Sequence, residues 1–99
     1  MDREKCMKRM NNAILKRKGS KTCISVIDLL LVRPYNNNKI AINLGIDYNT
    51  VRYHLNILIK NKLVMKDGDQ YGTLYYPTRC LMENLDMFKK VKDQLLGDK

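Results

Sequence analysis

The sequence predicts an α+β fold that is mostly α-helical. Apolar residues recur at helical spacing in several segments, and glycine or proline separates these segments from one another. A pair of short β-type runs flanks the turn residues Asp67, Gly68 and Asp69. The chain has 99 residues, of which 44% are hydrophobic and 29% charged, a balance typical of one small globular core. We therefore expect a single domain over residues 1–99.

Neither a membrane span nor an export signal is recognisable in the sequence. The longest apolar run covers residues 29–32, far short of the roughly 18 residues that a spanning helix needs. The first 20 residues are basic and contain asparagine, unlike a signal peptide. These features predict a cytoplasmic protein without a membrane partner.

The first third of the chain predicts two helices, the first over residues 1–18. Gly19 interrupts it, because glycine readily adopts the left-handed conformation that follows a helix end. A second helix over residues 22–32 ends ahead of Pro34, since the residue before a proline avoids the helical conformation.

The middle of the chain predicts a helix, a tight turn and a second helix. Ile40, Ala41 and Leu44 mark the inner side of the first of these helices, and Gly45 suits the turn. Asp47 is well placed to cap a helix over residues 47–61. That helix carries a buried-type stripe at helical spacing, made of Val51, Leu55, Leu58 and Ile59.

A β-hairpin and a last helix follow. Residues 63–66 and 72–76 have strand character, and Thr78 can cap a helix over residues 79–96. The order of these elements is that of a winged helix-turn-helix, with a three-helix core and a two-stranded wing over residues 22–78. Helices 1–18 and 79–96 would flank this core.

The segment NKIAINLGIDYNTVRYHLNILIKNKLV resembles the DNA-binding core of ArsR-like and MarR-like winged-helix regulators, especially small archaeal ones. The shared pattern is L-G-I and a polar residue, then T-V-x-x-H-L-x-x-L, then a turn into L-V. Here it is met by Leu44, Gly45, Ile46, Asp47, Thr50, Val51, His54, Leu55, Leu58, Leu63 and Val64. The thiol-rich motif of the metal-sensing ArsR branch is missing, as is the longer chain of a typical MarR protein. The resemblance therefore implies DNA binding and no particular effector.

Polar and aromatic side chains of helix 47–61 lie off its apolar stripe. Arginine can bind guanine O6 and N7 together, and asparagine can bind adenine N6 and N7. Residues near the N-terminus of a recognition helix usually reach the bases, while neighbouring lysines bind phosphate. We predict DNA contacts from Tyr48, Asn49, Thr50, Arg52, Tyr53, Asn56, Lys39, Lys66 and Gln70. The alternatives are a solvated helix face and a hairpin that only covers the core.

The net charge of +9 is concentrated at the N-terminus. Residues 1–22 hold eight basic and two acidic side chains, a balance of +6 (8 − 2). Such an excess favours binding to nucleic acid or to an anionic membrane surface through nonspecific electrostatics. The alternative is a solvated helix face that keeps the protein soluble.

The two flanking helices are the expected dimer surfaces. An isolated winged helix has a small contact area, so specificity usually requires two copies on a palindromic site. The apolar residues expected at this interface are Met7, Met10, Ile14, Leu81, Leu85, Phe88 and Leu95. The alternative is that both stripes fold back onto their own domain.

Neither a catalytic nor a metal site is expected. Cys6, Cys23 and Cys80 are widely spaced and odd in number, so free thiols are expected rather than a disulfide framework or a metal site. His54 is the single histidine of the chain and is expected to be structural, since no nucleophile or second ligand accompanies it. We expect no cofactor and no enzyme activity.

The function predicted from these patterns is a homodimeric, sequence-specific DNA-binding transcriptional regulator. The simplest form is a repressor that inserts helix 47–61 into the major groove of double-stranded DNA. Two alternatives remain open at this point: a winged-helix protein-interaction module, and a nonspecific nucleic-acid-binding protein. The sequence does not identify an effector or an operator.

Overall fold

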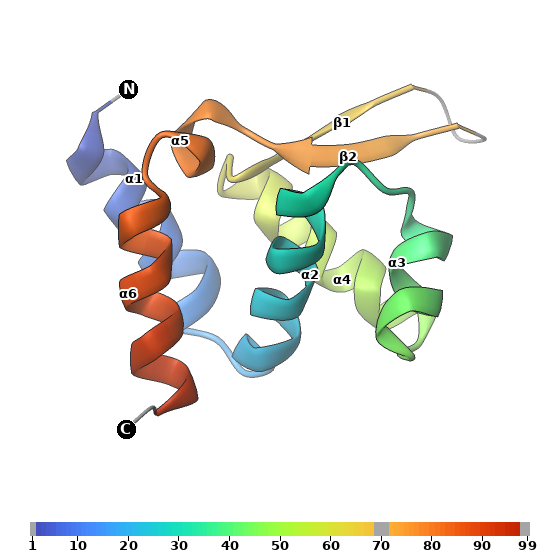
Figure 1. Cartoon of the computed structure of the whole chain (residues 1–99), viewed down its shortest axis with the longest axis horizontal. Helices are drawn as coiled ribbons and strands as arrows, with labels where there is room; N and C mark the ends of the chain where they lie inside the picture. The colour runs from blue at the N-terminus through green and yellow to red at the C-terminus, as the bar shows by residue number, and fades with distance from the viewer. Residues whose placement is uncertain (1, 69–71, 98–99) are drawn as a thin grey trace.

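The computed structural model describes residues 2–68 and 72–97 (Figure 1). Its elements, in chain order, are α1 (Arg3–Met10), a π-helical turn η1 (Asn11–Leu15), α2 (Ser20–Val32), α3 (Asn37–Leu44), α4 (Tyr48–Lys60), β1 (Val64–Asp67), β2 (Leu74–Pro77), α5 (Arg79–Met82) and α6 (Leu85–Leu96). The predicted mostly helical α+β class and winged-helix order are confirmed. Within the described ranges, no helix combines the length and apolarity required to cross a bilayer.

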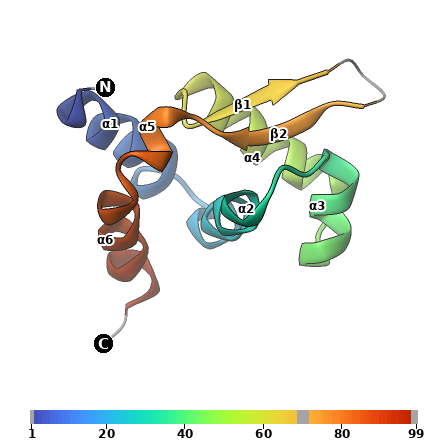
Figure 2. The ribbon, with the colours of Figure 1, turned by 45° about the horizontal axis from the view of Figure 1, so that its top comes forward.

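The winged-helix part consists of α2, α3 and α4 with the hairpin β1–β2. The strands pair antiparallel, from Val64 opposite Pro77 to Asp67 opposite Leu74, and the hairpin runs across α2 and α4 (Figures 1 and 2). The segment between α2 and α3 adds a further bridge to the hairpin. Tyr35 N–H donates to the Tyr75 carbonyl at 3.3 Å, and Tyr75 N–H donates to the Tyr35 carbonyl at 2.8 Å. This bridge, which the sequence pattern did not predict, ties the start of α3 to the hairpin.

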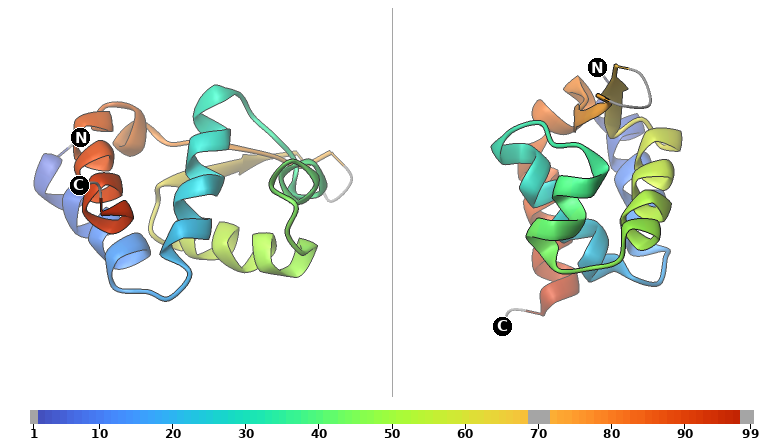
Figure 3. Two further views of the ribbon diagram at one scale, coloured as in Figure 1. Left: turned by 60° about the horizontal axis from the view of Figure 1, so that its bottom comes forward. Right: turned by 90° about the vertical axis from the view of Figure 1, so that its right-hand side faces the viewer.

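The flanking elements α1, η1, α5 and α6 gather at one end of the molecule, away from α3 (Figures 1 and 3). Four of the side chains expected at a dimer surface are buried in the chain's own core: Met10, Ile14, Leu81 and Phe88. These four follow the alternative in which the stripes fold back onto their own domain, because α1 packs against α5 and α6, and η1 and α6 pack on α2. Met7 and Leu85 are exposed, and Leu95 is partly buried against the core.

The first helix is shorter than the sequence predicted, and the second is longer. The first ends at Leu15 instead of continuing to residue 18, and α2 begins at Ser20, two residues earlier than expected. Ser20 closes this turn, because its hydroxyl lies 2.6 Å from the Ile14 carbonyl and 2.7 Å from that of Arg17.

The predicted helix over residues 79–96 is divided into α5 and α6 by a buried asparagine. The Asn84 side-chain amide donates to the Cys80 carbonyl at 2.9 Å, and its carbonyl accepts from the Arg3 guanidinium at 2.9 Å. An asparagine that bonds to a preceding backbone carbonyl competes with continued helix formation. Arg3 also pairs with Asp86 at 2.9 Å, so the same arginine ties α1 to the start of α6.

A disulfide joins Cys6 of α1 to Cys80 of α5. The expectation of three free thiols is therefore wrong for this pair. The two residues are 74 positions apart in sequence, but the packing of α1 against α5 brings their Cα atoms to 5.7 Å, within the usual range for a disulfide. Cys23 is a free, buried thiol, and burial raises its pKa to about 12, so it stays protonated.

Reduction of the Cys6–Cys80 bond should lower the free energy of unfolding by about 2–4 kcal/mol, because the bond restricts the unfolded chain. The measurement is urea denaturation followed by circular dichroism, with and without dithiothreitol. The Cys6→Ala/Cys80→Ala double variant is the control and should not respond to the reductant. Equal transition midpoints for the oxidised and reduced wild type would contradict this prediction.

Candidate nucleic-acid interface

The turn between α3 and α4 determines where α4 begins. Gly45 adopts a left-handed conformation, with φ +65°, which costs least for glycine. The Asp47 carboxylate accepts hydrogen bonds from the N–H groups of Asn49 (2.9 Å) and Thr50 (3.2 Å). These bonds satisfy donors that have no partner within the first turn of a helix. The predicted cap at Asp47 is therefore present, and α4 starts at Tyr48.

The outer face of α4 carries every side chain on this helix that was predicted to meet DNA. All six are exposed: Tyr48, Asn49, Thr50, Arg52, Tyr53 and Asn56. Five of them, all except Thr50, divide into two groups by helical position. Tyr48, Arg52 and Asn56 are four residues apart and share one side of the helix, whereas Asn49 and Tyr53 lie on the adjoining side.

Tyr48, Arg52 and Asn56 face a polar cleft of about 510 Å³ between α3, α4 and the hairpin. We call this site the polar cleft; its lining residues are Asn36, Asn37, Asn38, Tyr48, Arg52, Asn56, Lys66, Thr73 and Tyr75. Lys66, predicted as a phosphate contact in the wing, therefore lies beside three of the predicted residues of α4. The polar cleft contains two cationic side chains, and none of the described residues that line it is acidic.

Five lining residues of the polar cleft were not predicted from the sequence as site residues: Asn36, Asn37, Asn38, Thr73 and Tyr75. Asn36 was recognised only as a possible cap, and its side chain does accept from Lys39 N–H at 2.7 Å. Three successive asparagines at the start of a helix were the signal available, because one cap needs only one of them. Tyr75 reaches the cleft through the pairing of β1 with β2, in which it lies opposite Lys66.

Asn37 has an unused hydrogen-bonding atom at the edge of the polar cleft. Its side chain is 7% exposed, and its Oδ1 atom has no hydrogen-bond partner among the described residues. A buried polar atom without a partner is costly. A ligand or water that enters the polar cleft could supply the missing donor.

The electrostatics of the polar cleft favour an anionic ligand. Burial raises the pKa of the Tyr75 phenol, the nearby Tyr48 acts in the same direction, and Arg52 acts in the opposite direction. The phenol therefore stays protonated at neutral pH and can donate a hydrogen bond. Phosphate oxygens accept such bonds and pair with arginine and lysine.

The remaining predicted contacts lie outside the polar cleft. Lys39 is exposed on the first turn of α3, and Gln70 lies outside the described residues. Arg33, a further possible phosphate contact, is held against Tyr35: its guanidinium carbon is 5.4 Å from the ring centre, and its Nε donates to the phenol oxygen at 3.2 Å.

His54 packs against the turn that connects η1 to α2. The side chain is buried, and a Cβ atom at Gly19 would lie 3.1 Å from the imidazole Cε1 atom. This packing brings the basic turn at Lys16, Arg17 and Lys18 close to the middle of α4. Burial lowers the pKa of His54, and Arg17 contributes in the same direction. Within residues 2–68 and 72–97, no group of three His, Cys, Asp or Glu residues is placed to hold a metal ion.

A comparison with solved structures supports the fold. The chain is similar to the crystal structure of a "probable transcriptional regulator from Pseudomonas aeruginosa", with a TM-score of 0.57 and 17% sequence identity. The match covers 95% of this chain and 76% of that one. No protein-family model matches the sequence, and no curated protein is significantly similar to it. The likeness establishes a shared fold, and the resemblance to ArsR-like and MarR-like regulators stays a prediction.

The buried imidazole predicts a loss of stability in mild acid. Because the folded protein lowers the pKa of His54 relative to an unfolded value of about 6.5, the unfolded chain binds a proton more readily. The contribution of His54 is complete above pH 6.5 and is lost as the pH falls through the folded-state pKa. The free energy of unfolding, measured by urea denaturation between pH 7.5 and 5, should fall more steeply for wild type than for His54→Gln. If the free energy of unfolding depended on pH in the same way for both proteins, His54 would not be the cause of the pH dependence.

Proposed function

We propose that this protein is a sequence-specific DNA-binding transcriptional regulator that acts as a homodimer, most simply as a repressor that occludes a promoter. In this proposal α4 enters the major groove, and no catalytic residue or cofactor is needed. The observation that carries it is the polar cleft, where Tyr48, Arg52 and Asn56 of α4 meet Lys66 of the hairpin and the start of α3.

The roles of the cleft residues follow from their chemistry. Arg52 is the candidate for guanine recognition and Asn56 for adenine, since their side chains can form paired hydrogen bonds with those bases. Lys66 and the N–H groups at the start of α3 suit a backbone phosphate, because a helix N-terminus attracts anions. The donor Tyr75 could complete the same phosphate contact.

The basic turn beside α4 would add affinity that is independent of sequence. His54 packing on Gly19 brings the turn of Lys16, Arg17 and Lys18 next to the recognition helix, and all three side chains are exposed. Lysine and arginine near DNA release counterions and strengthen binding at low salt. In this proposal α4 provides the sequence selectivity, and the basic residues near the N-terminus provide much of the affinity.

The dimer surface in this proposal is smaller than the sequence suggested. The apolar side chains that are exposed on the flanking helices are Met7, Met82, Leu85 and Leu96. They lie on α1, α5 and α6, at the end of the molecule away from α3 (Figure 1). A two-fold dimer through this end would leave both copies of α4 available to DNA, about 34 Å apart if they occupy successive turns of the groove.

Arg52→Ala should remove sequence preference while leaving the fold intact, because the side chain is exposed. After selection of a preferred site from random DNA, the variant should lose about 1–3 kcal/mol of discrimination between that site and a scrambled duplex. Fluorescence anisotropy at several salt concentrations measures this difference. Arg79→Ala is the matched control, since Arg79 is also exposed but lies on α5 and pairs with Glu83.

Two results would reject the proposed specificity. Equal affinity of the wild type for selected and scrambled DNA, with a steep salt dependence, would instead indicate nonspecific nucleic-acid binding. A complete lack of DNA binding at physiological salt would favour a protein-interaction module.

Leu85→Glu should convert a dimer into a monomer, because the substitution places a charge on the proposed apolar interface. Sedimentation velocity over a range of protein concentrations measures the change. Leu74→Glu is the matched control: Leu74 is 43% exposed, close to the 41% of Leu85, but it lies in the hairpin. A wild type that sediments as a monomer at all concentrations would disprove the proposed dimer.

A further inference from the structure

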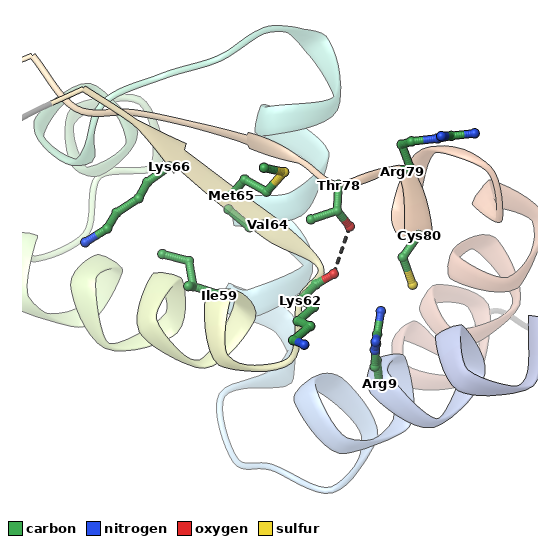
Figure 4. A pocket seen from close by; sticks show the side chains of 9 residues that line it. All are labelled: Arg9, Ile59, Lys62, Val64, Met65, Lys66, Thr78, Arg79 and Cys80. Atoms are coloured by element: carbon green, nitrogen blue, oxygen red, sulfur yellow. Dashed lines mark hydrogen bonds between the residues drawn. The ribbon is translucent and has the colours of Figure 1, made fainter. Parts of the chain in front are cut away.

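A second cleft, of about 640 Å³, lies on the other side of Lys66, between α1, the end of α4, β1 and α5 (Figure 4). We call it the apolar cleft; its lining residues are Arg9, Ile59, Lys62, Val64, Met65, Lys66, Thr78, Arg79 and Cys80. Cavities of 300–1,000 Å³ are typical of small-molecule sites. Nothing in the proposed recognition of DNA uses this space.

The wall of the apolar cleft is braced by contacts between distant parts of the chain. The Thr78 hydroxyl donates to the Lys62 carbonyl at 2.8 Å, and Thr78 N–H donates to the Leu63 carbonyl at 3.0 Å. Cys80 is bonded to Cys6, which holds α5 against α1. The cleft therefore has walls fixed by hydrogen bonds and a covalent bond.

The chemistry of the apolar cleft differs from that of the polar cleft. Ile59 and Met65 provide accessible apolar surface, while Val64 and Cys80 are at most 1% exposed. The four ionisable lining residues, Arg9, Lys62, Lys66 and Arg79, are all basic. Figure 4 shows the Arg9 side chain extending from α1 toward Cys80. Within the described part of the chain, the ammonium groups of Lys62 and Lys66 are not paired with an acidic side chain.

We propose that the apolar cleft binds a small organic carboxylate with an apolar body, such as a medium-chain fatty acid. The hydrocarbon would cover Ile59 and Met65, a contact favoured by the hydrophobic effect. The carboxylate would pair with the ammonium groups of Lys62 and Lys66, because hydrogen bonds between charged partners are stronger than those between neutral groups. A DNA backbone fits less well, because phosphates gain nothing from an apolar floor.

The ligand would also affect DNA binding, a consequence that rests on the function proposed above. Lys66 lines both clefts. A carboxylate paired with Lys66 would remove one cation from the polar cleft. Bound fatty acid should therefore weaken DNA binding and reduce the salt slope of that binding by about one, as the loss of one phosphate contact does.

The direct test is titration of the full chain with decanoate, below its micelle concentration and without DNA. Calorimetry gives the affinity, and ¹⁵N–¹H NMR spectra locate the site. Amide shifts are expected at Ile59, Val64, Met65 and Thr78. Decanol tests the apolar body without the charge, and acetate tests the charge alone; both should bind more weakly than decanoate.

Met65→Glu tests whether decanoate binds in the apolar cleft or nonspecifically elsewhere on the protein. It introduces a carboxylate into the apolar cleft. The affinity for decanoate should fall by about tenfold or more, because the two carboxylates repel each other. Leu74→Glu is the matched control, because Leu74 is 43% exposed against 46% for Met65, lies in the same hairpin and does not line the cleft. Its affinity for decanoate should equal that of the wild type.

Four results would overturn the proposed site: no binding of decanoate at millimolar concentration, amide shifts spread over the chain, equal weakening by both substitutions, or decanol binding as tightly as decanoate. Shifts of the cleft amides with protein concentration alone would also overturn it, since a second copy of the chain would then occupy the cleft. A chain that binds decanoate but no DNA would refute the function proposed above and leave the carboxylate site standing.

Discussion

Burial of the apolar stripe on α4 fixes the rotation of this helix about its own axis. Val51, Leu55 and Leu58 are all at most 1% exposed, and each such side chain contributes roughly 1.5–3 kcal/mol when removed from water. Rotating α4 to present another face would expose this stripe. Tyr48, Arg52 and Asn56 must therefore point outward whenever the core is formed, so that the candidate interface depends on core packing.

The hairpin forms one wall of the polar cleft beside the exposed face of α4. Lys66 and Tyr75 lie opposite each other in the β1–β2 pairing, and the Tyr35–Tyr75 bridge ties the same strand to the start of α3. A polar cleft results on one side of Lys66 and an apolar cleft on the other. One lysine between two differently lined clefts provides a physical route by which a bound anion could influence the proposed binding to DNA.

The flanking helices act as part of the core rather than as detachable arms. Cys6, Met10 and Ile14 at the N-terminus are each 0% exposed, and Leu81 of α5 is buried with them. The Arg3 contacts to Asn84 and Asp86, together with the Cys6–Cys80 disulfide, join the two ends of the chain. Deleting the basic N-terminus would therefore disturb the core, so its charge is better tested by substitution of exposed lysines such as Lys16 and Lys18.

Local patterns accounted for most of the elements. Helix α4, its cap at Asp47 and the turn at Gly45 follow from residues within a few positions of one another, which is why the sequence predicted them closely. The outer helices were predicted less well. A buried Asn84 and a Ser20 bonded to the Ile14 carbonyl end or divide helices through contacts that helical periodicity does not register. The same limit applies to Cys6 and Cys80, whose pairing depends on how α1 packs against α5.

The winged-helix order could be predicted from the residues alone, because each helix, turn and strand has a local pattern. The outward side chains of α4 could be predicted too, because they follow from the spacing of apolar residues along that helix. Three features depend on the tertiary structure. Met10, Ile14, Leu81 and Phe88 belong to the core. Asn37 and Tyr75 join Arg52 in one cleft, and Lys66 lines both clefts. The reason is physical: an apolar stripe is compatible equally with a partner molecule and with the chain's own core. Contacts between residues far apart in the sequence determine which of the two occurs, and the spacing of apolar residues does not reveal those contacts.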